Sequence, residues 1–110
     1  MLFTNFKYWL AVSLSAIASL PAHADKADQQ TGIGVGRALA IVEKCTGIGP
    51  TTDYVRSIFS HMVDQGVNGE DFKTGFTAGA VQASIIYPGK PPVSECKQAA
   101  LLKNKLDKQL

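Results

Sequence analysis

Residues 72–86, Phe-Lys-Thr-Gly-Phe-Thr-Ala-Gly-Ala-Val-Gln-Ala-Ser-Ile-Ile, carry a helical pattern with an unusual face of small side chains. Gly75, Gly79 and Ala83 recur at intervals of four and therefore stack on one side of the helix. Each glycine inside a helix costs about 0.5 to 1 kcal/mol relative to alanine. We expect close approach of another helix backbone, from this chain or a second copy, to offset that cost at this groove. The accompanying apolar positions are Phe72, Phe76, Ala80 and Ile86.

Two further helices are predicted before this segment. Apolar residues at helical spacing indicate the first of them: Val35, Ala38, Leu39, Val42 and Cys45. The glycines and the proline within residues 46–50 end it, because glycine suits a left-handed C-terminal position and proline cannot continue the hydrogen-bond ladder. Thr51 or Thr52 can cap the second helix, which has the clearest apolar stripe in the chain: Tyr54, Val55, Ile58, Phe59, Met62 and Val63.

The last helix is predicted beyond a proline-rich loop, residues 87–92. Asn68, followed by two acidic residues, caps the helix before the loop, and Ser94 is expected to cap the helix after it. The buried face of this last helix is predicted to hold Cys96, Ala99, Leu102 and Leu106. No segment has a defensible strand pattern. The fold class is therefore predicted to be all-α, a small four-helix domain.

The N-terminal 24 residues have the features of a secretory signal peptide. Lys7 precedes an apolar stretch over residues 9–20, and Ala22-His23-Ala24 forms a small-x-small cleavage site. A membrane span needs about 20 apolar residues, whereas this stretch is short and ends at Pro21. We expect cleavage after Ala24 and a periplasmic or secreted protein.

After cleavage, residues 25–110 are expected to form a single helical domain with a flexible start over residues 25–34. Gly32-Ile33-Gly34-Val35-Gly36 resembles a phosphate-binding loop. No strand precedes it, however, and the Gly-Lys-Ser or Gly-Lys-Thr of nucleotide-triphosphate sites is missing. The pattern favours a leader into the first helix, and no cofactor is expected.

Export would turn the two cysteines, Cys45 and Cys96, into an intramolecular disulfide. A domain of this size buries only about 60 to 65% of its unfolded surface and needs such a staple. Closing a loop of about 50 residues should raise the free energy of unfolding by roughly 4 kcal/mol, because it lowers the conformational entropy of the unfolded chain. A redox pair or a metal site is disfavoured, because the chain has no Cys-x-x-Cys and no histidine next to either cysteine.

Catalytic groups are scarce in the predicted mature chain. His61 is its only histidine, so a histidine-rich metal site is excluded and a Ser-His-Asp triad would depend on that residue alone. With both cysteines oxidised, no nucleophile stands out. We expect a protein that is not an enzyme, has no metal site, and carries His61 as an ordinary helix-surface residue.

The remaining expectation is function by protein contact. Residues 25–110 contain ten basic and nine acidic side chains, a balance that does not favour nucleic acid, and no membrane contact is expected after cleavage. We expect an inhibitor, an immunity-type protein that guards against a toxin, or an accessory protein of an envelope or secretion machine. A homodimer is left open. The candidate contact residues are Tyr87, Pro88, Lys90, Pro91 and Pro92. The alternative is that Tyr87 covers the core and the prolines only reverse the chain.

A second function class comes from a resemblance. One long loop between two cysteines, a helical body and a lysine-rich last segment resemble the small acid-stress chaperones of the enterobacterial periplasm. The resemblance implies a chaperone that acid activates. The chain departs from that family on both sides of Cys45, where Val42-Glu43-Lys44 and Thr46-Gly47 replace the family's aromatic and acidic residues. No functional residue is therefore transferred.

Overall fold

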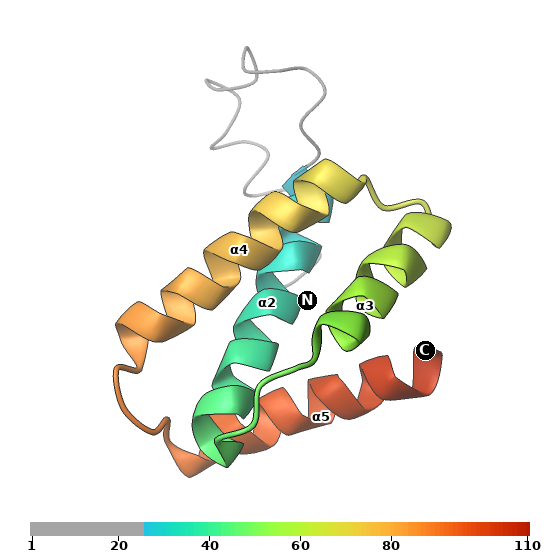
Figure 1. The fold of residues 1–110 in the computed structure, drawn as a ribbon. Coiled ribbons are helices and arrows are strands. Elements are labelled where there is room, and N and C mark those ends of the chain that lie inside the picture. Colours follow the sequence, from blue (N-terminus) through green and yellow to red (C-terminus); the bar gives the residue numbers. More distant parts are fainter. Residues whose placement is uncertain (1–25) are drawn as a thin grey trace, which may run out of the picture.

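The computed structural model describes residues 26–110, which form four helices and no strand (Figure 1). The helices are α2 (Lys26–Thr46), α3 (Thr52–Asp64), α4 (Gly69–Ile86) and α5 (Val93–Gln109). The predicted all-α class is thus confirmed, while the predicted signal peptide lies outside the described residues. Within residues 26–110, no helix has both the length and the apolar character needed to cross a membrane.

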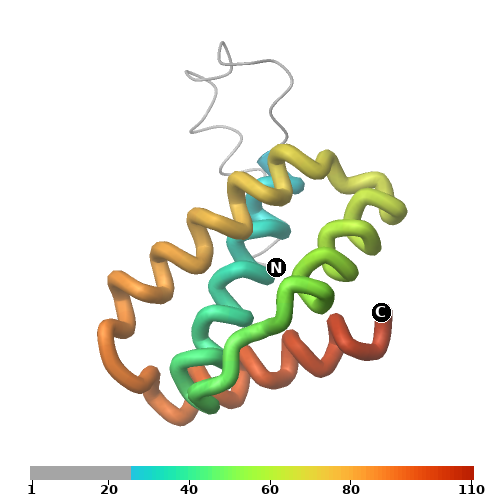
Figure 2. Tube along the Cα trace, viewed as in Figure 1, coloured from blue at the N-terminus to red at the C-terminus, as the bar shows by residue number. Residues whose placement is uncertain are grey.

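Helices α2 and α4 lie side by side and run in the same direction (Figure 2). Helix α3, which connects them in the chain, runs back in the opposite direction. Helix α5 crosses one end of this pair and contacts α2. At the opposite end, where α2 and α4 begin, a carboxylate oxygen of Asp28 accepts a hydrogen bond from the backbone N–H of Asn68 at 2.7 Å. This bond joins the starts of the two helices.

Glycines on both helices bring the backbones of α2 and α4 into contact. Gly32 and Gly36 of α2 are buried against the α4 backbone, and Gly75 and Gly79 of α4 are buried against the α2 backbone. A Cβ atom added at Gly36 would lie only 2.8 Å from the Cα atom of Phe76. The backbone that approaches the glycines of α4 is therefore α2 of the same chain.

Helix α2 begins earlier than the sequence pattern indicated. It starts at Lys26, well before Val35, so residues 26–34 belong to the helix instead of forming a flexible leader. The glycine-rich stretch that resembles a phosphate loop is helical, and Gly32 within it is buried under α4. Small residues pack this turn of α2, and hydrophobic periodicity does not detect a face built from glycine.

The core consists of two clusters along the α2–α4 pair. The first holds Val35, Leu39, Ile58, Phe72 and Leu106, and the second holds Ala38, Ile41, Ala83 and Ala99. Phe59 of α3 meets Phe72 and Phe76 edge-on, with ring centroids 4.9 and 5.3 Å apart. Ile86, which we expected in the core, is 51% exposed because it lies beyond Ala83, at the end of α4.

Helix caps follow the predicted chemistry at two of three starts. The hydroxyl of Thr51 accepts from the backbone N–H of Tyr54 at 3.1 Å, and the side-chain oxygen of Asn68 accepts from that of Asp71 at 3.0 Å. The prediction for α5 was wrong, since its N-cap is Pro92 and no side chain caps it. The carbonyl of Pro92 already accepts the first helical bond, from Cys96 at 3.0 Å.

The predicted disulfide between Cys45 and Cys96 is present. It joins the last turn of α2 to the first turn of α5, with the two Cα atoms 6.0 Å apart. Gly47, with φ +79°, ends α2 directly after the bridged turn. The bond therefore anchors α5 across the end of the α2–α4 pair.

The glycine contact predicts opposite effects for two neighbouring substitutions in α2. Gly36→Ala should lower the free energy of unfolding by about 1 to 3 kcal/mol, because its methyl group forces two backbones apart. Gly34→Ala should raise it by about 0.5 to 1 kcal/mol, because a Cβ there meets open space and alanine favours the helix. Urea denaturation of both variants measures the two effects, and equal effects would contradict the contact.

The disulfide predicts a large loss of stability in the double variant Cys45→Ala, Cys96→Ala. We expect the free energy of unfolding to fall by about 4 kcal/mol, since the unfolded chain regains the entropy of a long open loop. Guanidinium denaturation of the variant and of the reduced wild-type protein provides the measurement. The two should agree, and a variant as stable as the oxidised protein would rule out the role given to this bond.

Candidate functional site

The loop over residues 87–92 connects α4 to α5 at the end of the bundle that holds the disulfide. Two of its five predicted contact residues have structural roles. Tyr87 is half-buried and packs against the second core cluster, and Pro91 is buried with its carbonyl oxygen 3.7 Å from Sγ of Cys96. These two residues fit the alternative interpretation, in which Tyr87 covers the core and the prolines only reverse the direction of the chain.

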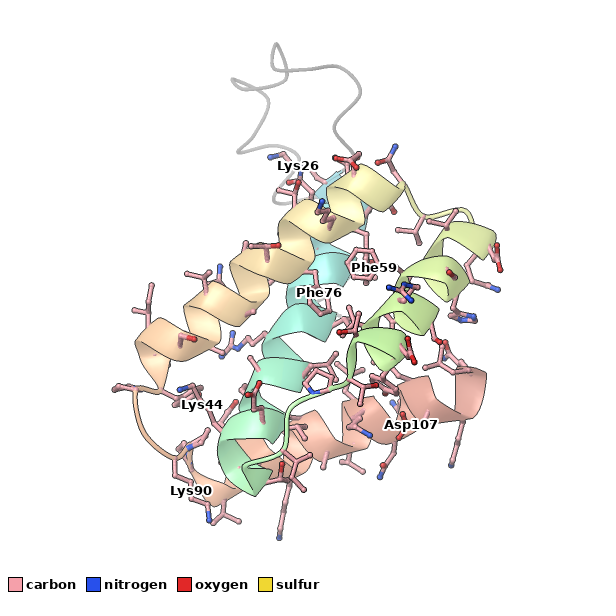
Figure 3. All side chains as sticks on the ribbon, in the orientation of Figure 1. Lys26, Lys44, Phe59, Phe76, Lys90 and Asp107 are labelled. Carbon is pink, nitrogen blue, oxygen red and sulfur yellow. A yellow bond between two sulfur atoms is a disulfide. The ribbon has the colours of Figure 1, made fainter. Side chains whose placement is uncertain are left out.

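The other three predicted residues, Pro88, Lys90 and Pro92, are exposed. Two apolar side chains border them, Ile86 at 51% exposure before the loop and Val93 at 70% exposure after it. We call these five residues the tip surface. Figure 3 shows Lys90 at the same end of the bundle as Lys44, and Lys26 at the opposite end.

The tip surface is held from both sides. Tyr87 fixes the end of α4 on the core, and the disulfide at Cys96 fixes the first turn of α5. Proline restricts the backbone between these anchors, because its ring fixes φ. The loop within the tip surface thus has few accessible conformations.

Sequence reasoning missed Ile86 and Val93 as members of this surface. A signal existed in the pair Ile85-Ile86, since consecutive helical residues point about 100° apart and cannot both face one narrow core. Val93 had no such signal. It is exposed because α5 begins there and turns Ala99 and Leu106 inward.

A shallow open groove of about 510 Å³ lies between α3 and the end of α5. Its lining residues are Asp53, Arg56, Ser57, Ser60, His61, Asp64, Gln109 and Leu110. Nε2 of His61 lies 3.1 Å from the side-chain oxygen of Gln109. That partner is an amide, whereas a carboxylate orients the histidine of a Ser-His-Asp triad. Within residues 26–110, no cluster of three or more His, Cys, Asp or Glu side chains could hold a metal ion.

Polar contacts also join α3 to α5 beside this groove. The hydroxyl of Tyr54 donates to the carboxylate of Asp107, and Nζ of Lys103 lies 3.0 Å from the other oxygen of that carboxylate. The same Nζ lies 5.0 Å from the centroid of the Tyr54 ring. The hydrogen bond from Tyr54, and then that from Lys103, lowers the pKa of Asp107. Partial burial, together with the nearby carboxylate, raises the pKa of Tyr54.

Comparison with known proteins adds no relative. No protein-family model, curated protein or solved structure matches this chain. The function proposed below therefore rests on the geometry of residues 26–110 and on the sequence.

The Asp107 contacts predict a specific pH dependence of stability. Because the folded state lowers the pKa of this carboxyl below its ordinary value near 3.9, the stabilisation is complete above about pH 4 and disappears as the pH falls through the lowered pKa. The carboxylate is exposed, so Asp107→Asn should cost less than about 1 kcal/mol at pH 7. Urea denaturation should show this difference shrinking between pH 4 and pH 2.

Tyr54→Phe is the companion variant, because the tyrosine hydroxyl is the main cause of the lowered pKa. Like Asp107→Asn, this variant should lose less of its free energy of unfolding than the wild type does when the pH falls from 4 to 2. Profiles parallel to that of the wild type from pH 7 to pH 2, for both variants, would contradict the assignment.

Proposed function

We propose that this protein is exported and acts, without catalysis, by binding another protein through the tip surface. The partner classes are a toxin or enzyme that it inhibits or guards against, and an envelope or secretion machine of which it is an accessory subunit. The single observation that carries the proposal is the exposure of Ile86 and Val93 on either side of a proline-rich loop.

The physical argument concerns how this apolar surface is presented. Apolar side chains stabilise a complex by about 25 cal/mol for each Å² that they remove from water. In this chain the exposed pair lies at the two helix ends that flank the loop, and Tyr87 and the disulfide anchor those ends, so little of that gain is lost to ordering. Lys90 lies between the two apolar side chains in sequence and supplies a charge that can select an acidic partner.

Export is supported by two independent features of the chain. The first 24 residues have the composition of a secretory signal, and a disulfide closes the fold. Disulfides persist in oxidising spaces such as the periplasm and are rare in the cytosol. We therefore propose a periplasmic or secreted location for the folded domain.

An acid-activated chaperone is the second candidate, and the Asp107 contacts favour it. They join α3 to α5, and Phe59 of α3 packs against Phe72 and Phe76 of α4. Loss of these contacts in acid would weaken the hold on α3 and allow that apolar surface to open. Dye binding and suppression of aggregation at pH 2 to 3 would favour this candidate over the contact protein.

Site-specific photo-crosslinking in living cells tests the contact function. A photoreactive residue in place of Lys90 or Val93 should give one discrete adduct in the cell envelope, whereas the same residue in place of Lys105, an exposed position in the last part of α5, should give none. Val93→Glu should weaken the adduct formed from position 90 at least tenfold, because it places a charge in the apolar contact. Mass spectrometry then identifies the partner.

The adduct pattern separates the outcomes. The same adduct from position 105 would show that the contact is not at the tip surface, and the absence of any adduct at neutral pH would contradict the proposal. Adducts to many different proteins that appear only in acid would point to the chaperone.

A further inference from the structure

The outer face of α4 carries a seam that no described element covers. Four residues form it, Thr74, Ala78, Val81 and Ile85, and we call it the outer seam of α4. Their spacing of four, three and four is that of the a and d positions of a coiled coil. Val81 is 52% exposed and Ile85 is 73% exposed, while Gly75 and Gly79 on the other side of the helix face α2. Figure 1 shows α4 at the edge of the bundle.

The outer seam lies in the longest uncharged part of the described chain. No Asp, Glu, Lys or Arg occurs from residue 74 to residue 89. The exposed side chains of the other helices include both signs of charge, such as Lys26 and Glu43 of α2, Asp53 and Arg56 of α3, and Lys97 and Asp107 of α5. The outer seam is thus uncharged over about three turns, and its exposed apolar side chains, Val81 and Ile85, lie on its C-terminal half beside the half-buried Ala78.

We infer that the outer seam of α4 binds a second copy of this chain. In a two-fold dimer each surface meets its own equivalent, so any charge near the axis would face a like charge. The outer seam has no charge to oppose its copy, and its a/d spacing allows the side chains of two helices to interdigitate. The occupant that best complements an uncharged surface with this repeat is the same surface.

The size of the outer seam sets the strength of the dimer. Stable protein interfaces bury about 800 Å² on each partner, and one helical seam of about three turns supplies less than that. We expect a reversible dimer with a dissociation constant on the order of 10 to 100 µM. The tip surface begins at Ile86, directly after the outer seam, so a dimer would carry two tip surfaces.

Sedimentation equilibrium of the purified full protein, from a few micromolar to several hundred micromolar, tests the inference. The wild type should pass from monomer to dimer across this range. Ile85→Glu should weaken the dimer at least tenfold, because it buries a charge opposite its own copy. Leu101→Glu is the matched control, since Leu101 is 62% exposed on α5 and lies outside the seam. It should leave the dissociation constant unchanged.

Cysteine substitution locates the contact. The native cysteines are paired, so a cysteine placed at Val81 or Ile85 is the only free thiol within residues 26–110. Oxidation of at least one of these two variants should yield a covalent dimer, because equivalent residues near a two-fold axis lie within the 7 Å that a disulfide can span. Leu101→Cys should stay monomeric on the same oxidation.

Several results would overturn the inference. These are a wild type that remains monomeric at every concentration, an equal effect of Ile85→Glu and Leu101→Glu, and a crosslink from position 101 alone. A monomer would point to a different protein as the occupant of the outer seam. Val93→Glu changes the tip surface and should not affect dimerisation, so failure of this inference is distinguishable from failure of the proposed function.

Discussion

The backbones of α2 and α4 lie in direct contact because glycines on each helix leave room for the other. Gly32 and Gly36 admit the backbone of α4, while Gly75 and Gly79 admit that of α2. Close approach increases the number of atoms in van der Waals contact and thereby offsets the low helix propensity of glycine. The two helices run in the same direction, so their starts meet at one end of the molecule and their ends at the other.

The positions of α3 and α5 follow from this pair. A parallel pair requires α3 to return along the side of the bundle, where Ile58 and Phe59 close the first core cluster. Helix α5 crosses the end of the pair, and the disulfide between Cys45 and Cys96 holds it there. A small core needs such a link, since a domain of this size has little apolar area to bury.

Both surfaces to which we assign a function are consequences of the same arrangement. The face of α4 that meets α2 leaves Val81 and Ile85 on the outside, and the end of α4 delivers Ile86 to the tip surface beside the disulfide. The contact between α3 and α5 is different in kind, because Asp107 and its polar partners carry part of it. The molecule thus combines a closely packed pair of helices with a third helix that polar contacts help to hold.

Local chemistry in the sequence determined the number of helices, a cap at Thr51 or Thr52, the cap at Asn68, the disulfide, and half of the glycine groove. These features depend on neighbouring residues, or on the only possible pairing of two cysteines. Tertiary structure alone decided that Gly32 and Gly36 complete the groove, that α2 starts at Lys26, and that Tyr87 and Pro91 are covered while Ile86 and Val93 are exposed. A periodic pattern gives the faces of a helix but not the neighbour of each face, because burial is settled by the packing of segments that are far apart in the chain.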